Sequence, residues 1–141
     1  MASAAADRIT SRPIGDVHDS ARRAGLVCVL TEDRLGEVAG IMSRSNIGAV
    51  LVLEPSGRLA GIFTERDLLH HIGASGSLDA EAPIGTLMTA SPWGIENDTT
   101  VGEVAGNMIK RGFRHAVIYD RNREPVGIVS MRDMLAALVG R

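Results

Sequence analysis

The chain, 141 residues long, contains two copies of one pattern. Residues 36–40 (GEVAG) recur as residues 102–106, an offset of 66 positions. The same offset aligns residues 61–67 (GIFTERD) with residues 127–133 (GIVSMRD) without a gap. Because chance rarely produces two such blocks in one register, we expect the chain to consist of two copies of one supersecondary unit.

The hydrophobic pattern of the first copy predicts a β-α-β-β-α unit. Residues 27–30 are a short apolar run, typical of a buried strand, and apolar residues then recur at helical spacing over residues 35–42. The β-rich segments 48–53 and 59–63 flank a Pro-Ser-Gly turn, which predicts a hairpin. A helix is expected to begin at Thr64.

The second copy follows the same order. It predicts a strand over residues 93–96, a helix over 101–110, a hairpin of 116–119 with 125–129, and a final helix over 130–138. The fold class expected is therefore α+β, with two β-α-β-β-α repeats.

The repeats set the expected domain boundaries. Residues 14–72 form repeat 1 and residues 84–139 form repeat 2, joined by a linker over 73–83 that is rich in Gly, Ala and Ser; residues 1–13 are a flexible N-terminus. Neither half is long enough to bury a large core alone. We therefore expect the halves to pack sheet against sheet with pseudo-two-fold symmetry.

Composition excludes several classes of function. A formal net charge of −2 leaves no basic surface for binding nucleic acid or an anionic membrane. The single cysteine, Cys28, excludes an internal disulfide and is expected in the core. The chain has no signal-peptide pattern and no run of about 18 apolar residues, so a cytoplasmic protein is expected.

Each copy ends its hairpin in the pattern hydrophobic-Gly-hydrophobic-x-(Thr/Ser)-x-x-Asp, directly before a helix. The polar positions are Thr64 and Asp67 in the first copy and Ser130 and Asp133 in the second. Together with the repeated β-α-β-β-α order, this pattern resembles the tandem cystathionine-β-synthase (CBS) domain pair, or Bateman module, over nearly the whole chain. The sequence departs from many members in carrying no attached effector domain, which implies a stand-alone module.

The resemblance implies a function. CBS pairs bind adenosine-containing ligands such as AMP, ADP, ATP or S-adenosylmethionine in clefts between the two repeats, commonly form homodimers, and regulate enzymes, channels or transporters. For this chain it implies a regulatory module that takes an adenosine ligand, requires no cofactor, and acts on a partner that the sequence does not identify.

The Thr/Ser-x-x-Asp motifs have two interpretations. One is a helix cap, in which the hydroxyl accepts from the N3 amide and the N3 side chain reaches back to the cap amide; Asp is shorter than the usual Glu or Gln. The other, implied by the resemblance, is that Asp67 and Asp133 each accept hydrogen bonds from the two ribose hydroxyls of a ligand, with Thr64 and Ser130 close to its phosphate side. Capping and binding are compatible.

The two sites are expected to differ in charge. Carried over by position, the residues facing the phosphates of a nucleotide held by Asp67 would be Arg114, His115 and Arg132. The site of Asp133 would meet the less basic set Ser45, Asn46 and Arg66. Trp93 is expected either to contact adenine or to pack in the core.

Other classes of function find less support. The adjacent His70 and His71 point about 100° apart on a helix and cannot form an i,i+4 metal site. The chain shows no nucleophile–base pair and no acid/base constellation, so we expect no enzyme. The alternative to a ligand sensor is a ligand-free structural dimer that docks onto a partner protein.

Overall fold

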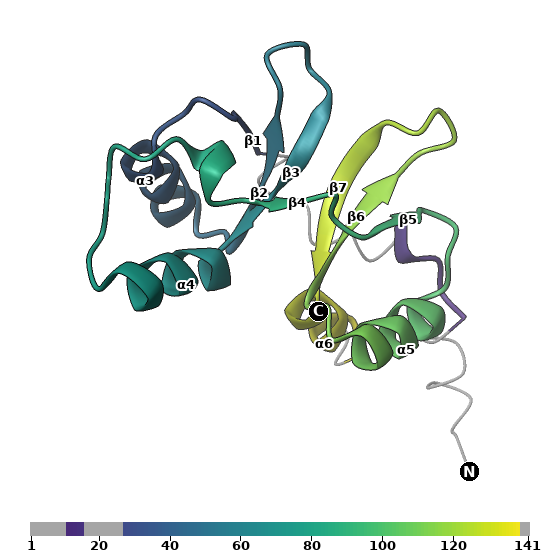
Figure 1. Cartoon of the computed structure of the whole chain (residues 1–141). Helices are drawn as coiled ribbons and strands as arrows, with labels where there is room; N and C mark the ends of the chain where they lie inside the picture. Colours follow the sequence, from purple (N-terminus) through teal and green to yellow (C-terminus); the bar gives the residue numbers. More distant parts are fainter. Residues whose placement is uncertain (1–10, 16–26, 139–141) are drawn as a thin grey trace. The chain divides into compact units, whose positions relative to one another are not determined.

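The computed structural model describes residues 11–15 and 27–138, which fall into two compact units (Figure 1). The first unit contains residues 27–92, and the second unit contains residues 93–138 together with residues 11–15. Each unit holds one β-α-β-β-α pattern, so the predicted α+β class with two such repeats is confirmed.

The first unit is a four-stranded sheet with order β1-β2-β3-β4 (Figure 1). Strand β1 runs parallel to β2, and the other neighbours are antiparallel. Its elements are β1 (Cys28–Leu30), α3 (Leu35–Ser45), β2 (Ala49–Leu53), β3 (Leu59–Thr64), α4 (Glu65–Ser75), the short 3-10 helix η1 (Ile84–Thr86) and β4 (Thr89–Ala90).

The second unit is a three-stranded sheet with order β5-β6-β7, in which β5 is parallel to β6 and β6 antiparallel to β7. Its elements are β5 (Gly94–Glu96), α5 (Val101–Arg111), β6 (His115–Tyr119), β7 (Pro125–Ser130) and α6 (Met131–Leu138). The chain passes close to itself at Gly94, where a Cβ atom would lie 2.2 Å from the Tyr119 ring, so a side chain at that position of β5 would require the ring to move.

Strand alternation decides which side chains enter the core of the first unit. Val50, Val52 and Phe63 are fully buried in one cluster with the apolar stripe of α3. Leu51 and Ile62, which pair across β2 and β3, lie on the opposite face of the sheet. The sheet is therefore apolar on both faces.

The second unit repeats this arrangement. Ala116, Ile118 and Val129 pack in one cluster with Val104 and Met108 of α5 and with residues of α6. Val117 and Ile128 pair across β6 and β7 on the other face of the sheet. Apolar side chains on both faces of each sheet are consistent with the expected sheet-against-sheet packing, which stays a prediction.

The first helices of the two units, α3 and α5, begin in different ways. Helix α5 has the side-chain cap expected of a helix start, because Thr100 Oγ1 accepts a hydrogen bond from the amide of Glu103 at 3.3 Å. Helix α3 has Arg34 at its cap position and no side-chain cap. Its first amides, of Leu35 and Gly36, instead donate to the carbonyls of Ala82 and Ala80, at 2.9 Å each.

These bonds correct the expected linker over 73–83. Its first residues continue α4 as far as Ser75, and residues 80–83 pack against the start of α3. Glu81 also forms an ion pair with Arg34, and Pro83 bridges to Arg34. Gly, Ala and Ser suggested a spacer, but in this segment small side chains permit close approach to α3, where Ala80 lies against Gly36.

The Ile-Gly pair that begins each predicted repeat, Ile14-Gly15 and Ile84-Gly85, packs in the unit formed mainly by the other repeat. Ile84 is fully buried in the first unit, and its amide donates to the Asp33 carbonyl at 2.7 Å. Ile14 is fully buried in the second unit, and its amide donates to the Thr99 carbonyl at 2.7 Å. The packing units therefore differ from the predicted repeat boundaries at 14 and 84: residues 14–15 belong to the second unit, and residues 84–92 belong to the first.

The predicted flexible N-terminus falls mostly outside the described residues, since residues 1–10 are not among them. At its end, the Arg12 carbonyl accepts from the amide of Val101 at 2.8 Å, and Pro13 bridges to Thr100. Residues 12 and 13 thus belong to the second unit and differ from the expectation.

Candidate ligand-binding site

The first motif lies where β3 ends and α4 begins. The Asp67 carboxylate oxygen Oδ2 accepts from the Thr64 amide at 2.9 Å and from the Thr64 hydroxyl at 3.1 Å. In return, the Asp67 amide donates to Thr64 Oγ1 at 3.3 Å, which completes a capping box. The amide of Glu65 donates to the Gly48 carbonyl at 3.0 Å and holds the start of α4 beside the residue that precedes β2.

The second motif has the same geometry at the junction of β7 and α6. The Ser130 amide donates to Asp133 Oδ2 at 2.8 Å, and the Asp133 amide donates to Ser130 Oγ at 3.0 Å. The amide of Met131 donates to the Arg114 carbonyl at 3.0 Å. The capping interpretation is therefore confirmed for both motifs, and the shorter Asp side chain makes the reciprocal bond.

The capping box leaves each carboxylate able to accept further hydrogen bonds. All four polar side chains of the motifs are half-buried, so each carboxylate keeps access to solvent. Each lies at the first turn of a helix, where unpaired amides and the helix dipole favour anionic groups. This arrangement can accept hydroxyl donors at the carboxylate and place a phosphate near the helix terminus.

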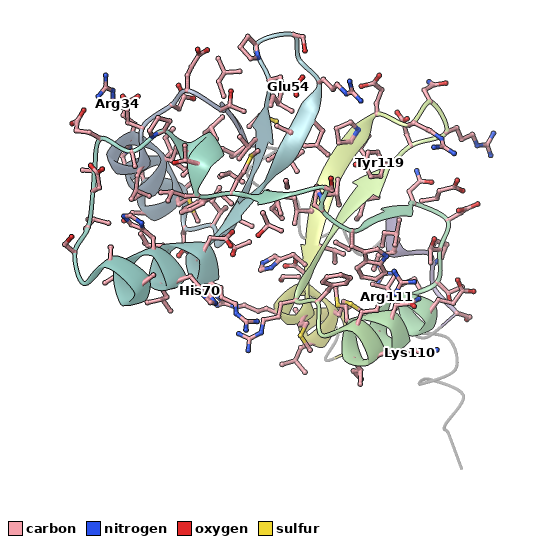
Figure 2. The ribbon with its side chains drawn as sticks, in the orientation of Figure 1. Arg34, Glu54, His70, Lys110, Arg111 and Tyr119 are labelled. Carbon is pink, nitrogen blue, oxygen red and sulfur yellow. The ribbon has the colours of Figure 1, made fainter. Side chains whose placement is uncertain are left out.

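The predicted basic residues all lie in the second unit. Arg114 and Arg132 are exposed, and His115 is half-buried opposite Ser130 in the β6–β7 register. Lys110 and Arg111, in the last turn of α5, are further basic residues of this unit (Figure 2). Their association with Asp67, a residue of the first unit, stays a prediction.

Trp93 packs on the core of the second unit. It lies directly before β5, against the buried cluster, and its ring stacks on Phe113 with centroids 5.6 Å apart and planes 21° apart. Of its two interpretations, core packing is the one that the structure supports.

The structure also places Cys28 and the two adjacent histidines, His70 and His71. Cys28 is exposed, and the prediction that it lies in the core is wrong, because Val29 alone of β1 faces the helices. Neighbouring atoms still desolvate the thiol enough to raise the pKa of Cys28 above its ordinary value. His70 lies on α4 (Figure 2), and His71 Nε2 accepts from the Asp79 amide at 3.3 Å.

Neither a metal site nor a membrane-spanning helix is present among the described residues. Within residues 11–15 and 27–138, no group of three or more His, Cys, Asp or Glu side chains is placed to hold a metal ion. In the same part of the chain, no helix has the length and apolar character needed to cross a membrane.

The sequence pattern missed one residue beside the first motif. Thr89, in the two-residue strand β4, donates from Oγ1 to Asp67 Oδ1 at 3.0 Å. No local sequence pattern predicts this contact. Strand β4 is too short to show an alternation of buried and exposed residues, and Thr89 lies 22 positions from Asp67. Only the return of residues 80–90 onto β3 brings them together.

Comparison with known proteins places this geometry in a family. The CBS domain profile matches residues 14–74 and again residues 84–140. An uncharacterized 17.7 kDa protein of Acidianus ambivalens is 35% identical over 105 residues, which are 74% of this chain and 62% of that protein. The chain thus spans less than two thirds of that relative's length.

Two solved structures are similar in fold. A CBS-domain containing protein of Agrobacterium tumefaciens has a TM-score of 0.80 at 28% identity, covering 91% of this chain and 94% of the other. A CBS domain protein of Pyrobaculum aerophilum, solved in complex with AMP, has a TM-score of 0.75 at 21% identity, covering 92% and 100%. With the profile matching both repeats, the chain belongs to the CBS domain family.

Proposed function

We propose that this chain is a regulatory module that binds an adenosine-containing ligand, such as AMP, ADP, ATP or S-adenosylmethionine. The observation that carries the proposal is the pair of equivalent carboxylates, Asp67 and Asp133, each oriented by a capping box at the first turn of a helix. Membership of the CBS family and the AMP complex of a protein with the same fold support it.

The proposed chemistry is recognition without reaction. An ionised carboxylate offers two acceptor oxygens, which suit the two adjacent hydroxyls of a ribose. The capping hydroxyls, Thr64 and Ser130, would lie toward the phosphate side of the ligand. We propose no catalytic role and no required cofactor, with the cytoplasm as the setting and a protein partner as the regulated target.

A ligand panel tests the proposal. We expect the midpoint of thermal unfolding to rise with at least one of AMP, ADP, ATP or S-adenosylmethionine, with NADH and GTP for comparison. A ligand at about 100 times its Kd adds about 2.7 kcal/mol to the free energy of unfolding, a shift of roughly 5–15 °C for a chain of this size. Absence of a shift with every adenosine ligand would contradict the proposed function.

We further propose that Arg114, His115 and Arg132 bind the phosphates. Replacing Arg114 and Arg132 together with alanine is expected to weaken ATP binding about 10- to 100-fold, since hydrogen bonds between charged partners are the strong ones. Adenosine binding should change less than about 3-fold. Titration calorimetry with both ligands measures the difference, and equal losses for the two would contradict the phosphate role.

A second candidate, a ligand-free homodimer that docks onto a partner, is favoured by exposed apolar side chains on the motif helices. Leu69 on α4 is 68% exposed, and Leu135, its counterpart on α6, is 62% exposed. Because a homodimer could also bind a ligand, dimerisation does not distinguish the two functions. The ligand panel does, since the second candidate predicts no shift in the midpoint of thermal unfolding with any ligand.

A further inference from the structure

The two motif carboxylates differ in how many of their acceptor sites are already used. Asp67 receives three donors: the Thr64 amide, the Thr64 hydroxyl and the Thr89 hydroxyl. Among the described residues, Asp133 receives one, the Ser130 amide. An ionised carboxylate has about four lone-pair sites, so roughly one remains at Asp67 and about three at Asp133.

The difference is largest at the oxygen that the capping box leaves available. In both motifs the box uses Oδ2. The other oxygen, Oδ1, accepts from Thr89 Oγ1 at Asp67, and makes no hydrogen bond to the described residues at Asp133. A ribose diol that gives one hydroxyl to each oxygen would therefore find Oδ1 open at Asp133, whereas at Asp67 Oδ2 already accepts two donors and Oδ1 already accepts one.

The sheet holds Thr89 in this place. Strand β4 pairs antiparallel with β3, so that Thr89 lies opposite Ile62 and Ala90 opposite Gly61. A Cβ atom at position 61 would lie 2.4 Å from the Thr89 carbonyl oxygen, so the close pairing depends on Gly61. The hydroxyl thus reaches Asp67 from a positioned strand.

We propose that Thr89 determines the ligand affinity of Asp67, by competing with the ligand's hydroxyls for Oδ1, and that the Asp133 site fills first. The inference rests on the proposed function and deepens it. A ribose diol needs two acceptor sites and Asp67 has about one left, so full binding there displaces a donor such as the Thr89 hydroxyl, whereas binding at Asp133 displaces no described contact of Oδ1. More of the affinity at Asp67 must then come from other parts of the ligand, such as its phosphates.

The test is titration calorimetry of the full chain with AMP and with ATP. In an Asp133→Ala background, which retains only the Asp67 site, Thr89→Val is expected to tighten AMP binding about 3- to 10-fold, because the competing donor is gone. Valine keeps the shape of threonine and suits a strand. In an Asp67→Ala background, the same change should leave the affinity at Asp133 within about 2-fold.

A neighbouring threonine supplies the control. The Thr86 hydroxyl donates to the Pro83 carbonyl at 2.7 Å and makes no bond to Asp67, so Thr86→Val should leave AMP affinity unchanged. If Thr89→Val left AMP affinity unchanged in the Asp133→Ala background, this inference would be overturned and the proposed function would stand. Weaker binding would also overturn it, and would identify the hydroxyl as a ligand contact. A wild-type chain that binds neither nucleotide would remove the proposed function for adenine nucleotides, and this inference with it.

Discussion

Replacing Asp67 or Asp133 with alanine is expected to weaken binding of the adenosine ligand about 10- to 1000-fold at the altered site. Each carboxylate is proposed to accept two ribose hydroxyls, and a hydrogen bond to a charged acceptor contributes about 1.5–3 kcal/mol. Titration calorimetry on the two single variants and the double variant measures the effect site by site. A double variant whose affinity stays within a factor of two of wild type would contradict the ribose assignment.

Alanine at these positions also removes half of a capping box, at a cost of about 0.5–2 kcal/mol of stability. Asparagine separates the two effects: its amide oxygen can still accept from the Thr64 or Ser130 amide, whereas the charge and the second acceptor are lost. We therefore expect Asp67→Asn and Asp133→Asn to lose affinity with a smaller loss of stability.

A cap outside the site provides the matched control. Thr100 caps α5 through the amide of Glu103 and belongs to neither motif. Thr100→Ala is expected to lower stability by about 1 kcal/mol and to leave ligand affinity unchanged. If it weakened binding as much as Asp67→Ala does, loss of a cap would explain both results.

Replacing Ile84 with alanine is expected to lower the free energy of unfolding by about 2–5 kcal/mol, the usual cost of truncating a fully buried isoleucine. Ile84 directly follows the predicted linker over residues 73–83. If this part of the chain were only a spacer, it would tolerate such a change. In the structure it is fully buried in the core of the first unit, and its amide donates to the Asp33 carbonyl. Denaturant unfolding followed by circular dichroism measures the change.

The control is Leu78→Ala in the same segment, because Leu78 is 55% exposed and its loss should change stability by less than about 0.5 kcal/mol. Fluorescence adds a second readout, since the only tryptophan, Trp93, packs on the core of the second unit. A shift in both signals would show that the units unfold together; a shift in circular dichroism alone would show that they unfold separately. Equal stability of Ile84→Ala and Leu78→Ala would contradict the packing of Ile84.

Local periodicity was sufficient for most of the secondary structure. The helical spacing of Leu35, Val38 and Met42 predicted the buried stripe of α3, because side chains three and four positions apart share one face of a helix. Turn chemistry between residues 53 and 59 predicted the β2–β3 hairpin. The Thr-x-x-Asp spacing predicted the capping box, and the resemblance to the CBS family implied the candidate ligand-binding carboxylates.

Periodicity failed where the outcome depended on what covers a strand. The run over residues 27–30 predicted β1 but not that Cys28 faces away from the helices, because an unbroken apolar run carries no alternation. Strand β4, with two residues, was missed for the same reason.

The sequence by itself determined the repeat, the order of helices and strands in each copy, the motif positions and the family, since these depend on residues close together in the chain. Two features depended on tertiary structure alone. Ile14, from the first repeat, packs in the core of the second unit, and Ile84, from the second repeat, packs in the core of the first unit. The Thr89 hydroxyl donates a hydrogen bond to one oxygen of Asp67. Such contacts join residues far apart in the chain, and they form only because buried apolar surface and unpaired backbone amides need partners that their own segment does not supply.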